Sequence, residues 1–159
     1  MKTRKMKGFT LVELIVVIAI IGVLAAILVP TMLGYVKKSK VSAANSNAKS
    51  LYDAVATSLI EMDTESYNFA SNQYTGTVQT AVVTAGNTQA YLDWKIYNYF
   101  NGVSKLSTFG YEVQSMAVVG AVTDDGTYMG TYPKPSTNDN ATGAGKHASI
   151  NDALDWAKS

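Results

Sequence analysis

Apolar side chains fill one long stretch near the beginning of the chain. Between Leu14 and Val29 there is no charged or polar side chain, and the apolar character continues with minor breaks to Val36. Counted from Phe9, the stretch has 28 residues, or about 42 Å as a helix. A hydrocarbon core is about 30 Å thick, and a helix that is apolar on all sides belongs in lipid or inside an assembly. The pattern predicts a transmembrane or assembly helix over residues 9–36.

Beyond Pro30 the pattern becomes one-sided, and the same helix is expected to continue as the spine of a soluble part. Apolar residues recur there at spacings of three and four, which is typical of one packed helix face; they are Val41, Ala44, Ala48, Leu51, Val55, Leu59 and Met62. Polar residues lie on the opposite side, namely Lys49, Asp53, Thr57 and Glu61. We expect one helix from Phe9 to about Met62.

The rest of the chain predicts short elements around this helix. Residues 63–87 are polar and predict a loop, with a short element at Val78–Val83. Residues Gln89–Phe100 predict a second helix, with its apolar face made by Tyr91, Leu92, Ile96, Tyr99 and Phe100. Two strands are expected, Tyr111–Thr123 and Thr127–Tyr132, joined by a two-residue turn centred on Asp125-Gly126. Ser149 is a cap for a last helix, Ile150–Lys158.

Charge is unevenly distributed along the chain. Four of the 13 basic residues lie in the first seven positions, at Lys2, Arg4, Lys5 and Lys7. Without residues 1–8, nine basic residues face twelve acidic ones, so the remainder has no basic surplus for nucleic-acid phosphates. Basic residues ahead of a span favour a cytoplasmic N-terminus. The three lysines just beyond the span weaken this argument. The chain has no cysteine and hence no disulfide.

Glu13 is the single acidic residue inside the apolar stretch. A carboxylate at membrane depth costs about 2.5–3.5 kcal/mol, so it is a functional candidate that needs a partner. A position near the end of the span, where the side chain reaches the headgroups, is the simpler alternative. Gly22 and Pro30 also interrupt the stretch, and Pro30 removes an amide donor from the helix. Both are candidates for weakening the helix, or for an ordinary kink.

The first forty residues closely resemble the class III signal of type IV prepilins and pseudopilins. The resemblance rests on the basic leader, the run Lys7-Gly8-Phe9-Thr10-Leu11-Val12-Glu13, and the apolar segment that follows through Gly22 to Pro30. It implies that a membrane peptidase cuts between Gly8 and Phe9, and that the new N-terminal Phe9 is N-methylated. It also implies a fold of class α+β, with a long N-terminal helix packed on a small antiparallel sheet.

The resemblance implies a structural filament subunit and no enzyme or cofactor. The expected regions are a leader at residues 1–8, the apolar helix at 9–36 and a soluble head at 37–159. The expected partners are further copies of the chain, a prepilin peptidase and N-methyltransferase, a membrane assembly platform, and the lipid bilayer before assembly. The precursor would cross the cytoplasmic membrane once with its C-terminus outside, and the subunit would then enter a filament at the cell surface.

Physical arguments give Glu13 a role in this assembly. Cleavage after Gly8 creates an α-amino group one helical turn from Glu13. Two opposite charges attract strongly in a dry filament core, and neither is tolerated there alone. Glu13 of one subunit would therefore pair with the Phe9 amine of its neighbour. The alternatives are a pseudopilin of a secretion or DNA-uptake system and a singly anchored surface protein, which has no use for a buried acid.

Other candidate chemistry has simpler explanations. His147 is the only histidine and lies in a Gly/Ala-rich segment without patterned neighbours, so it is interpreted as a solvated loop residue. Several oxygen-bearing residues suit Ca²⁺, but turn chemistry explains them equally well; they are Asp124, Asp125, Asn138, Asp139 and Asn140. Asn140-Ala141-Thr142 matches a glycosylation acceptor, a common three-residue match. The ten tyrosines are interpreted as packing residues.

Overall fold

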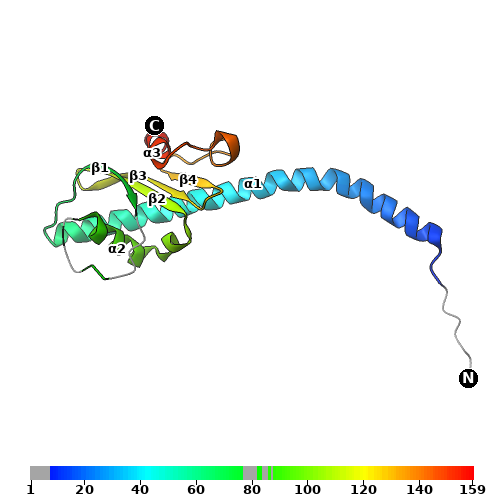
Figure 1. Ribbon diagram of the computed structural model, residues 1–159, viewed down its shortest axis with the longest axis horizontal. Helices are drawn as coiled ribbons and strands as arrows, with labels where there is room; N and C mark the ends of the chain where they lie inside the picture. Colours follow the sequence, from blue (N-terminus) through cyan, green and yellow to red (C-terminus); the bar gives the residue numbers. More distant parts are fainter. Residues whose placement is uncertain (1–7, 77–81, 84–85, 87) are drawn as a thin grey trace, which may run out of the picture. The chain divides into compact units, whose positions relative to one another are not determined.

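The computed structural model of the chain describes residues 8–76, 82–83, 86 and 88–159 (Figure 1). The chain divides into two units, one ending at Lys37 and one comprising Lys38–Ser159. Helix α1 (Leu11–Thr64) contributes to both. The second unit adds a four-stranded antiparallel sheet and two further α-helices. The predicted α+β fold, a long N-terminal helix with a small antiparallel sheet, is confirmed.

The first part of α1 is covered by no other described residue. Its large apolar side chains from Leu11 to Val36 are 46–75% exposed. Within the described part of the chain, α1 is the one helix long and apolar enough to cross a membrane. The helix continues through Gly22 and Pro30. An apolar surface of this size is unfavourable in water, so lipid or other protein must cover it.

The second part of α1 is the spine of the core. All seven apolar residues that the spacing predicts for one face are buried, from Val41 to Met62, which confirms that prediction. The sequence pattern succeeds here because positions three and four apart share one helix face. Leu51, Val55 and Leu59 pack with Tyr111 and Val113 of the sheet. This contact places α1 against one face of the sheet.

The sheet has the order β1-β2-β3-β4, with every pair antiparallel. The strands are β1 (Asn72–Gly76), β2 (Thr108–Gln114), β3 (Ala117–Asp124) and β4 (Met129–Tyr132). Strand β1 lies in the segment for which a loop was expected, so that part of the prediction is wrong. Its sequence, Asn-Gln-Tyr-Thr-Gly, lacks the apolar alternation of a half-buried strand. Pairing with β2 stabilises β1 instead.

The single strand expected over Tyr111–Thr123 is in fact the hairpin of β2 and β3. Gln114 pairs with Ala117, which leaves a two-residue turn at Ser115 and Met116. Both turn residues have positive φ, 51° and 62°, as a type I′ hairpin turn requires. Neither is Gly or Asn, the residues that usually indicate such a turn, so the sequence contained no signal for it. Packing of Met116 against the core supports the turn from the tertiary structure.

The next turn was expected in the right place but with the wrong length. Asp124 pairs with Met129, so four residues connect β3 to β4 instead of two. The Oδ1 atom of Asp125 accepts the amides of Thr127 and Tyr128 at 2.8 and 2.7 Å. Gly126 has a φ of 92°, a conformation that glycine adopts easily. Hydrogen bonds of the Asp125 side chain therefore stabilise the longer turn.

Helices cover both faces of the sheet. Helix α3 (Ile150–Lys158) lies opposite α1 and packs Ala153 and Leu154 against Val122 and Met129. It begins as predicted, because the Ser149 side chain accepts the amide of Asp152 at 3.1 Å. Its last lysine, Lys158, forms an ion pair with the buried Glu112 of β2 at 2.7 Å. In this cysteine-free chain, packing and an ion pair hold the C-terminal helix to the sheet.

Helix α2 (Gln89–Tyr99) and the short 3-10 helix η1 (Asn101–Lys105) complete the core beside α1. Tyr91, Leu92 and Ile96 are buried as predicted, whereas Tyr99 is 49% exposed and does not belong to the packed face. Its hydroxyl donates instead to Glu61 of α1. Of the short element expected at Val78–Val83, residues 78–81 lie outside the described residues, and Val82 and Val83 are in neither helix nor strand.

Candidate functional site

The candidate site is the beginning of α1, where Thr10 and Glu13 form hydrogen bonds with each other. The Glu13 carboxylate accepts the Thr10 amide at 2.8 Å and the Thr10 hydroxyl at 2.7 Å through the same oxygen, Oε2. In return, the Glu13 amide donates to the Thr10 hydroxyl at 3.2 Å. This reciprocal arrangement is a capping box, which satisfies backbone donors that a helix N-terminus leaves unpaired. Glu13 therefore has hydrogen-bond partners within its own chain.

These partners do not neutralise the carboxylate. Thr10 supplies a hydroxyl and an amide, both uncharged donors, so a full negative charge stays on Glu13. Hydrogen bonds reduce the cost of placing that charge in an apolar environment, but an unpaired buried charge still costs several kcal/mol. One oxygen, Oε1, accepts no hydrogen bond within the described part of the chain. The geometry therefore leaves Glu13 able to accept one more donor, ideally a cation.

The junction between Gly8 and Phe9 lies just ahead of this cap. Phe9 is 82% exposed, and Gly8 is exposed as well. A side chain at Gly8 would meet nothing within 4 Å, so packing within this chain does not require glycine there. The four leader charges lie in residues 1–7, outside the described residues. What this chain supplies at the junction is an accessible peptide bond outside helix and strand.

Gly22 and Pro30 lie further along α1 and do not approach the cap. Pro30 has no amide hydrogen to donate to the Ala26 carbonyl. The Thr31 hydroxyl donates to the Leu28 carbonyl at 2.8 Å, one of few polar contacts in the apolar stretch. No other described residue touches the space beside Gly22. A role of these two residues in weakening the helix stays a prediction.

The C-terminal loop does not assemble a metal or catalytic centre from the candidates weighed above. No group of three or more His, Cys, Asp or Glu side chains suited to a metal lies among the described residues. Asp124 pairs with Lys146 at 2.7 Å, and Asp125 holds the β3–β4 turn. The Asn140 side chain accepts the Thr137 amide at 2.7 Å. An ion pair and turn and loop hydrogen bonds thus engage the side-chain oxygens of three of the five calcium candidates, Asp124, Asp125 and Asn140.

His147 differs from the sequence interpretation of a solvated loop residue. Its ring lies 5.9 Å from that of Trp156, and its Nε2 atom is buried without a hydrogen-bond partner among the described residues. Burial lowers the pKa of His147, an effect that Asp152 partly opposes. The interpretation failed because no sequence pattern announces that α3 returns against this loop.

Sequence reasoning missed the part of Thr10 in the site. The signal was present, because Thr10 and Glu13 have the Thr-x-x-Glu spacing that precedes an apolar helix in a capping box. The same type of signal was recognised at Ser149.

Comparisons with known proteins match the beginning of the chain. Residues 3–29 match the family model described as the prokaryotic N-terminal methylation motif. The type IV major pilin protein PilA of Myxococcus xanthus is 47% identical over 57 residues, 36% of this chain and 26% of that protein. A type IV major fimbrial protein FimA of Dichelobacter nodosus is 46% identical over 55 residues, 35% of each chain.

A longer match reaches further into the chain. The type IV wide pilus major component PilA4 of Thermus thermophilus is 40% identical over 83 residues, 52% of this chain and 56% of that protein. The chain thus covers about a quarter to just over half of the length of these relatives. No solved structure matches the chain significantly. The family model concerns the N-terminal part, these relatives match about a third to a half of the chain, and the fold of the rest is known from the structure described above.

Proposed function

We propose that the chain, a type IV pilin-like protein with a class III signal, is a structural subunit of a type IV pilus or pilus-like filament. The observation that carries the proposal is the exposed apolar surface of α1 from Leu11 to Val36, which no described residue of the chain covers. A bilayer covers this surface in the precursor, and neighbouring subunits cover it in the filament. The names of the relatives, which are major pilin and major fimbrial proteins, favour a pilin over a pseudopilin.

Processing precedes assembly in this proposal. A membrane peptidase cuts between Gly8 and Phe9, and Phe9 is then N-methylated. The cut removes four cationic side chains, which otherwise hold the N-terminus at the cytoplasmic face. It also creates an α-amino group, with an ordinary pKa of about 7.7–8.0, which stays cationic after methylation. An assembly platform in the membrane then receives the subunit, whose C-terminal head lies outside.

Glu13 selects the position of the incoming subunit. In the membrane, the amide and hydroxyl of Thr10 in the same chain donate hydrogen bonds to one carboxylate oxygen of Glu13. The remaining oxygen and the negative charge are then available to the Phe9 amine of a neighbouring subunit. Because an isolated charge is costly in a dry core, the filament favours the stagger between subunits that brings these two groups together.

Three substitutions separate the charge of Glu13 from its capping role. Glu13→Leu removes both, Glu13→Gln keeps a hydrogen-bonding side chain without the charge, and Thr10→Val keeps the charge without the cap. We expect both Glu13 variants to be inserted and cleaved normally but to form few or no filaments. Thr10→Val should still assemble, with a modest loss from the missing cap of about 1 kcal/mol.

Electron microscopy of sheared surface material, with a membrane blot for processed subunit, measures these outcomes. Normal filaments from Glu13→Gln would show that hydrogen bonding alone suffices and would overturn the charge pairing. Normal display of every variant as a monomer, with no filament from the unmodified chain, would contradict the filament proposal itself.

The cleavage site has a separate measurement. Intact-mass spectrometry of the filament protein should give a chain that starts at Phe9 and carries one added methyl group. A bulky residue in place of Gly8 should leave uncut precursor in the membrane. Since the described structure has open space at Gly8, the fold would tolerate that substitution. A filament subunit that retains Met1, or that begins after Val36, would exclude the proposed processing.

A further inference from the structure

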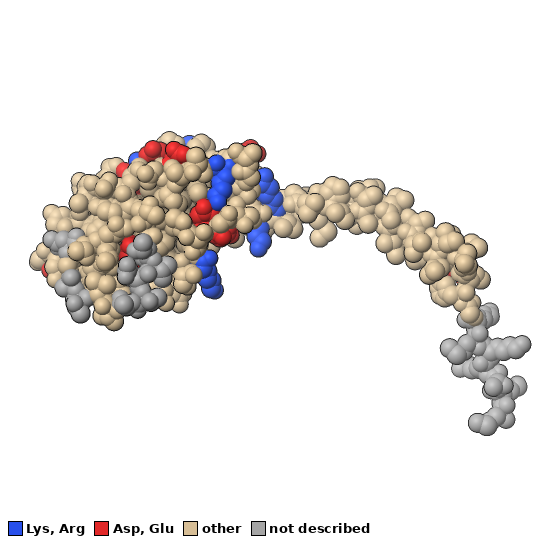
Figure 2. Space-filling model, in the orientation of Figure 1, with Lys and Arg blue, Asp and Glu red and all other residues tan. Residues whose placement is uncertain are grey.

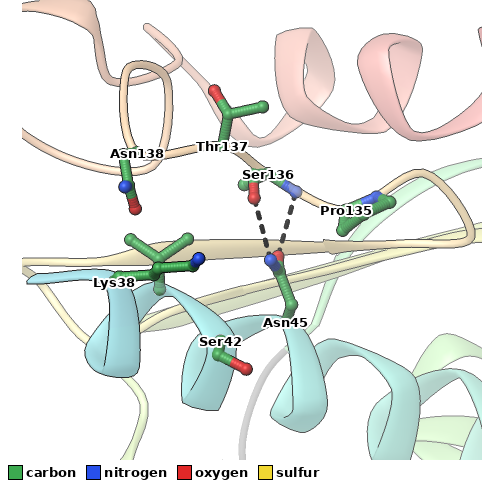
Figure 3. A pocket seen from close by; sticks show the side chains of 8 residues that line it. Lys38, Ser42, Asn45, Pro135, Ser136, Thr137 and Asn138 are labelled. Atoms are coloured by element: carbon green, nitrogen blue, oxygen red, sulfur yellow. Dashed lines mark hydrogen bonds between the residues drawn. The ribbon is translucent and has the colours of Figure 1, made fainter. Parts of the chain in front are cut away.

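A hollow of about 290 Å³ lies between α1 and the loop that follows β4 (Figure 3). Lys38, Val41 and Ser42 line it from the helix, and residues 135–138 line it from the loop. Ligand pockets begin at about this size, roughly 300 Å³. Asn45 closes its inner end, because its amide donates to the Ser136 carbonyl at 2.8 Å and accepts the Ser136 amide at 3.0 Å. These bonds fix the loop to the helix, so the walls of the hollow are held in place.

Three donors in the hollow have no partner. Lys38, Ser42 and Asn138 are exposed, and none of their side chains makes a hydrogen bond or ion pair within the described part of the chain. Figure 3 shows the Asn138 side chain directed from the loop toward α1 and the Lys38 side chain lying along α1 on the opposite wall. No acidic side chain is among the eight described residues that line the hollow. An ammonium, a hydroxyl and an amide without a carboxylate suit a phosphate group.

The position of Lys38 along the chain indicates where such a phosphate would come from. The apolar segment ends at Val36, two residues earlier, and Figure 2 shows almost no charged atoms along it. Its 26 helical residues from Leu11 to Val36 make about 39 Å of helix, close to the roughly 40 Å of a bilayer with its headgroups. Lys38 therefore leaves the bilayer at the level of the outer phosphates. The half-buried Lys37 and the exposed Lys40 add two cations beside it.

We infer that this hollow binds the phosphate headgroup of an anionic phospholipid in the outer leaflet while the subunit waits in the membrane. This inference rests on the proposed function, since it requires a subunit that spans the bilayer before assembly. Lys38 supplies the charge, Ser42 and Asn138 donate hydrogen bonds, and Val41 forms an apolar floor. Bound lipid holds the head at a fixed height above the membrane until the subunit is extracted.

The experiment uses the full chain in nanodiscs made of equal amounts of phosphatidylglycerol and phosphatidylcholine. Native mass spectrometry after release measures which lipid remains bound to the protein. The unmodified chain should retain phosphatidylglycerol in preference. Lys38→Gln should reduce that preference about fivefold, as expected for one lysine at an anionic surface. Ser42→Val, which changes no charge, should reduce it at least about threefold through a lost charge-assisted hydrogen bond.

Lys49→Gln is the matched control, because Lys49 is an exposed lysine of the same helix outside the hollow. It should leave the lipid preference unchanged. An equal loss in Lys49→Gln and Lys38→Gln would show diffuse attraction without a site and would overturn the inference. Equal retention of both lipids by the unmodified chain would overturn it as well. If millimolar glycerol phosphate in solution displaced the bound lipid, the hollow would be assigned to a soluble ligand instead.

Two further outcomes are distinguishable from these. Dimers that disappear in Lys38→Gln, without any change in bound lipid, would identify a second copy of the chain as the occupant and reject the lipid. A full chain that fails to insert into nanodiscs of any composition would contradict the proposed function, and the lipid site with it. Insertion without lipid preference would reject the lipid site alone.

Discussion

The backbone of β4 approaches α1 closely at Gly130. A Cβ atom built there would lie 2.0 Å from the Ala44 carbonyl oxygen of the helix. The Thr123 hydroxyl of β3 donates to the same carbonyl at 3.1 Å. Backbone is in direct contact with backbone here, and neither can move without disturbing the other. The φ angle of Gly130 is not positive, so its backbone conformation does not require glycine. Glycine is required because the helix backbone lies too close for a Cβ atom.

We predict that Gly130→Ala destabilises the head by about 3 kcal/mol or more, because the added methyl group overpacks a rigid contact. Thermal unfolding of the full chain in detergent measures the effect. Gly120→Ala is the matched control on the neighbouring strand, since its Cβ would meet only side chains at 3.5 Å or more. That variant should change stability by less than about 1 kcal/mol. Similar losses in both variants would contradict the assignment of the strain to the Ala44 contact.

Asn45 acts at the same contact through its side-chain amide. Besides its two bonds to Ser136, its Oδ1 atom accepts the Thr131 amide at 3.1 Å. We predict that Asn45→Ala lowers the free energy of unfolding by about 2–3 kcal/mol, since three hydrogen bonds are lost at about 1 kcal/mol each. Asn47→Ala, an exposed neighbour on the same helix, should have little effect. Urea unfolding compares the two, and an equal loss would show that helix propensity, and not the network, is responsible.

At the scale of elements, an ion-pair cluster joins the end of α1 to α2. Lys95 of α2 is almost fully buried and donates to Glu61 of α1 and to Glu65, which directly follows α1, at 2.9 Å each. Tyr91 and Tyr99 of α2 also donate to these carboxylates. Burial alone would lower the pKa of Lys95, but the hydrogen bonds to Glu65 and Glu61 more than reverse this and raise it. The cluster therefore requires both carboxylates in their charged form.

The cluster predicts how stability depends on pH. Hydrogen bonds from Tyr99 and then Lys95 lower the pKa of Glu61, and those from Tyr91 and then Lys95 lower that of Glu65. A carboxyl group whose pKa is lower in the folded state stabilises the fold above its unfolded pKa, 4.5 here, and loses this contribution as the pH falls through the folded pKa. Stability should therefore decrease as the pH falls below 4.5.

Melting temperatures from pH 7 to pH 2 measure this dependence. The double variant Glu61→Gln, Glu65→Gln should be less stable at pH 7 than the unmodified chain. Its melting temperature should also fall less as the pH is lowered. Asp63→Asn removes an exposed carboxylate between the two that bonds to no described side chain, and it should leave the slope unchanged. If the melting temperature of the double variant fell with pH as steeply as that of the unmodified chain, the groups responsible would lie elsewhere, for instance at Glu112.

At the scale of the whole molecule, the chain consists of a unit with a core and a unit without one. Every buried apolar residue of the described chain lies at or beyond Val41, and the division between the units falls after Lys37. The second unit buries both faces of its sheet, under α1 and α3. It therefore has the packed interior that independent folding needs.

We predict that a fragment from Lys37 to Ser159 is soluble, monomeric and cooperatively folded. The reason is that removing residues 9–36 removes exposed apolar surface and no buried contact. Size-exclusion chromatography and a single cooperative melting transition measure this. Aggregation, or a gradual loss of structure on heating, would show that the first part of α1 is needed for the head to fold.

Local sequence was enough for those features whose physical cause is local. The apolar run to Val36, the buried face of α1 and the Ser149 cap follow from helix periodicity and neighbouring side chains. The residues of the candidate site at Gly8, Phe9 and Glu13 are a contiguous motif, so no folded partner is needed to recognise them. Even the Thr10–Glu13 cap, which was overlooked, has a spacing that can be read directly.

Contacts between distant segments decided the rest. Strand β1 exists because β2 offers it hydrogen bonds, and the Ser115-Met116 turn is held by a core that closes around Met116. The cover of α3 over the second face of the sheet depends on residues more than twenty positions away along the chain, and this placement of α3 also brings Trp156 beside His147. The hollow at Lys38 combines a helix with a loop almost one hundred residues later. Such features depend on contacts between segments that are far apart in the sequence, and only the folded chain determines which segments are in contact.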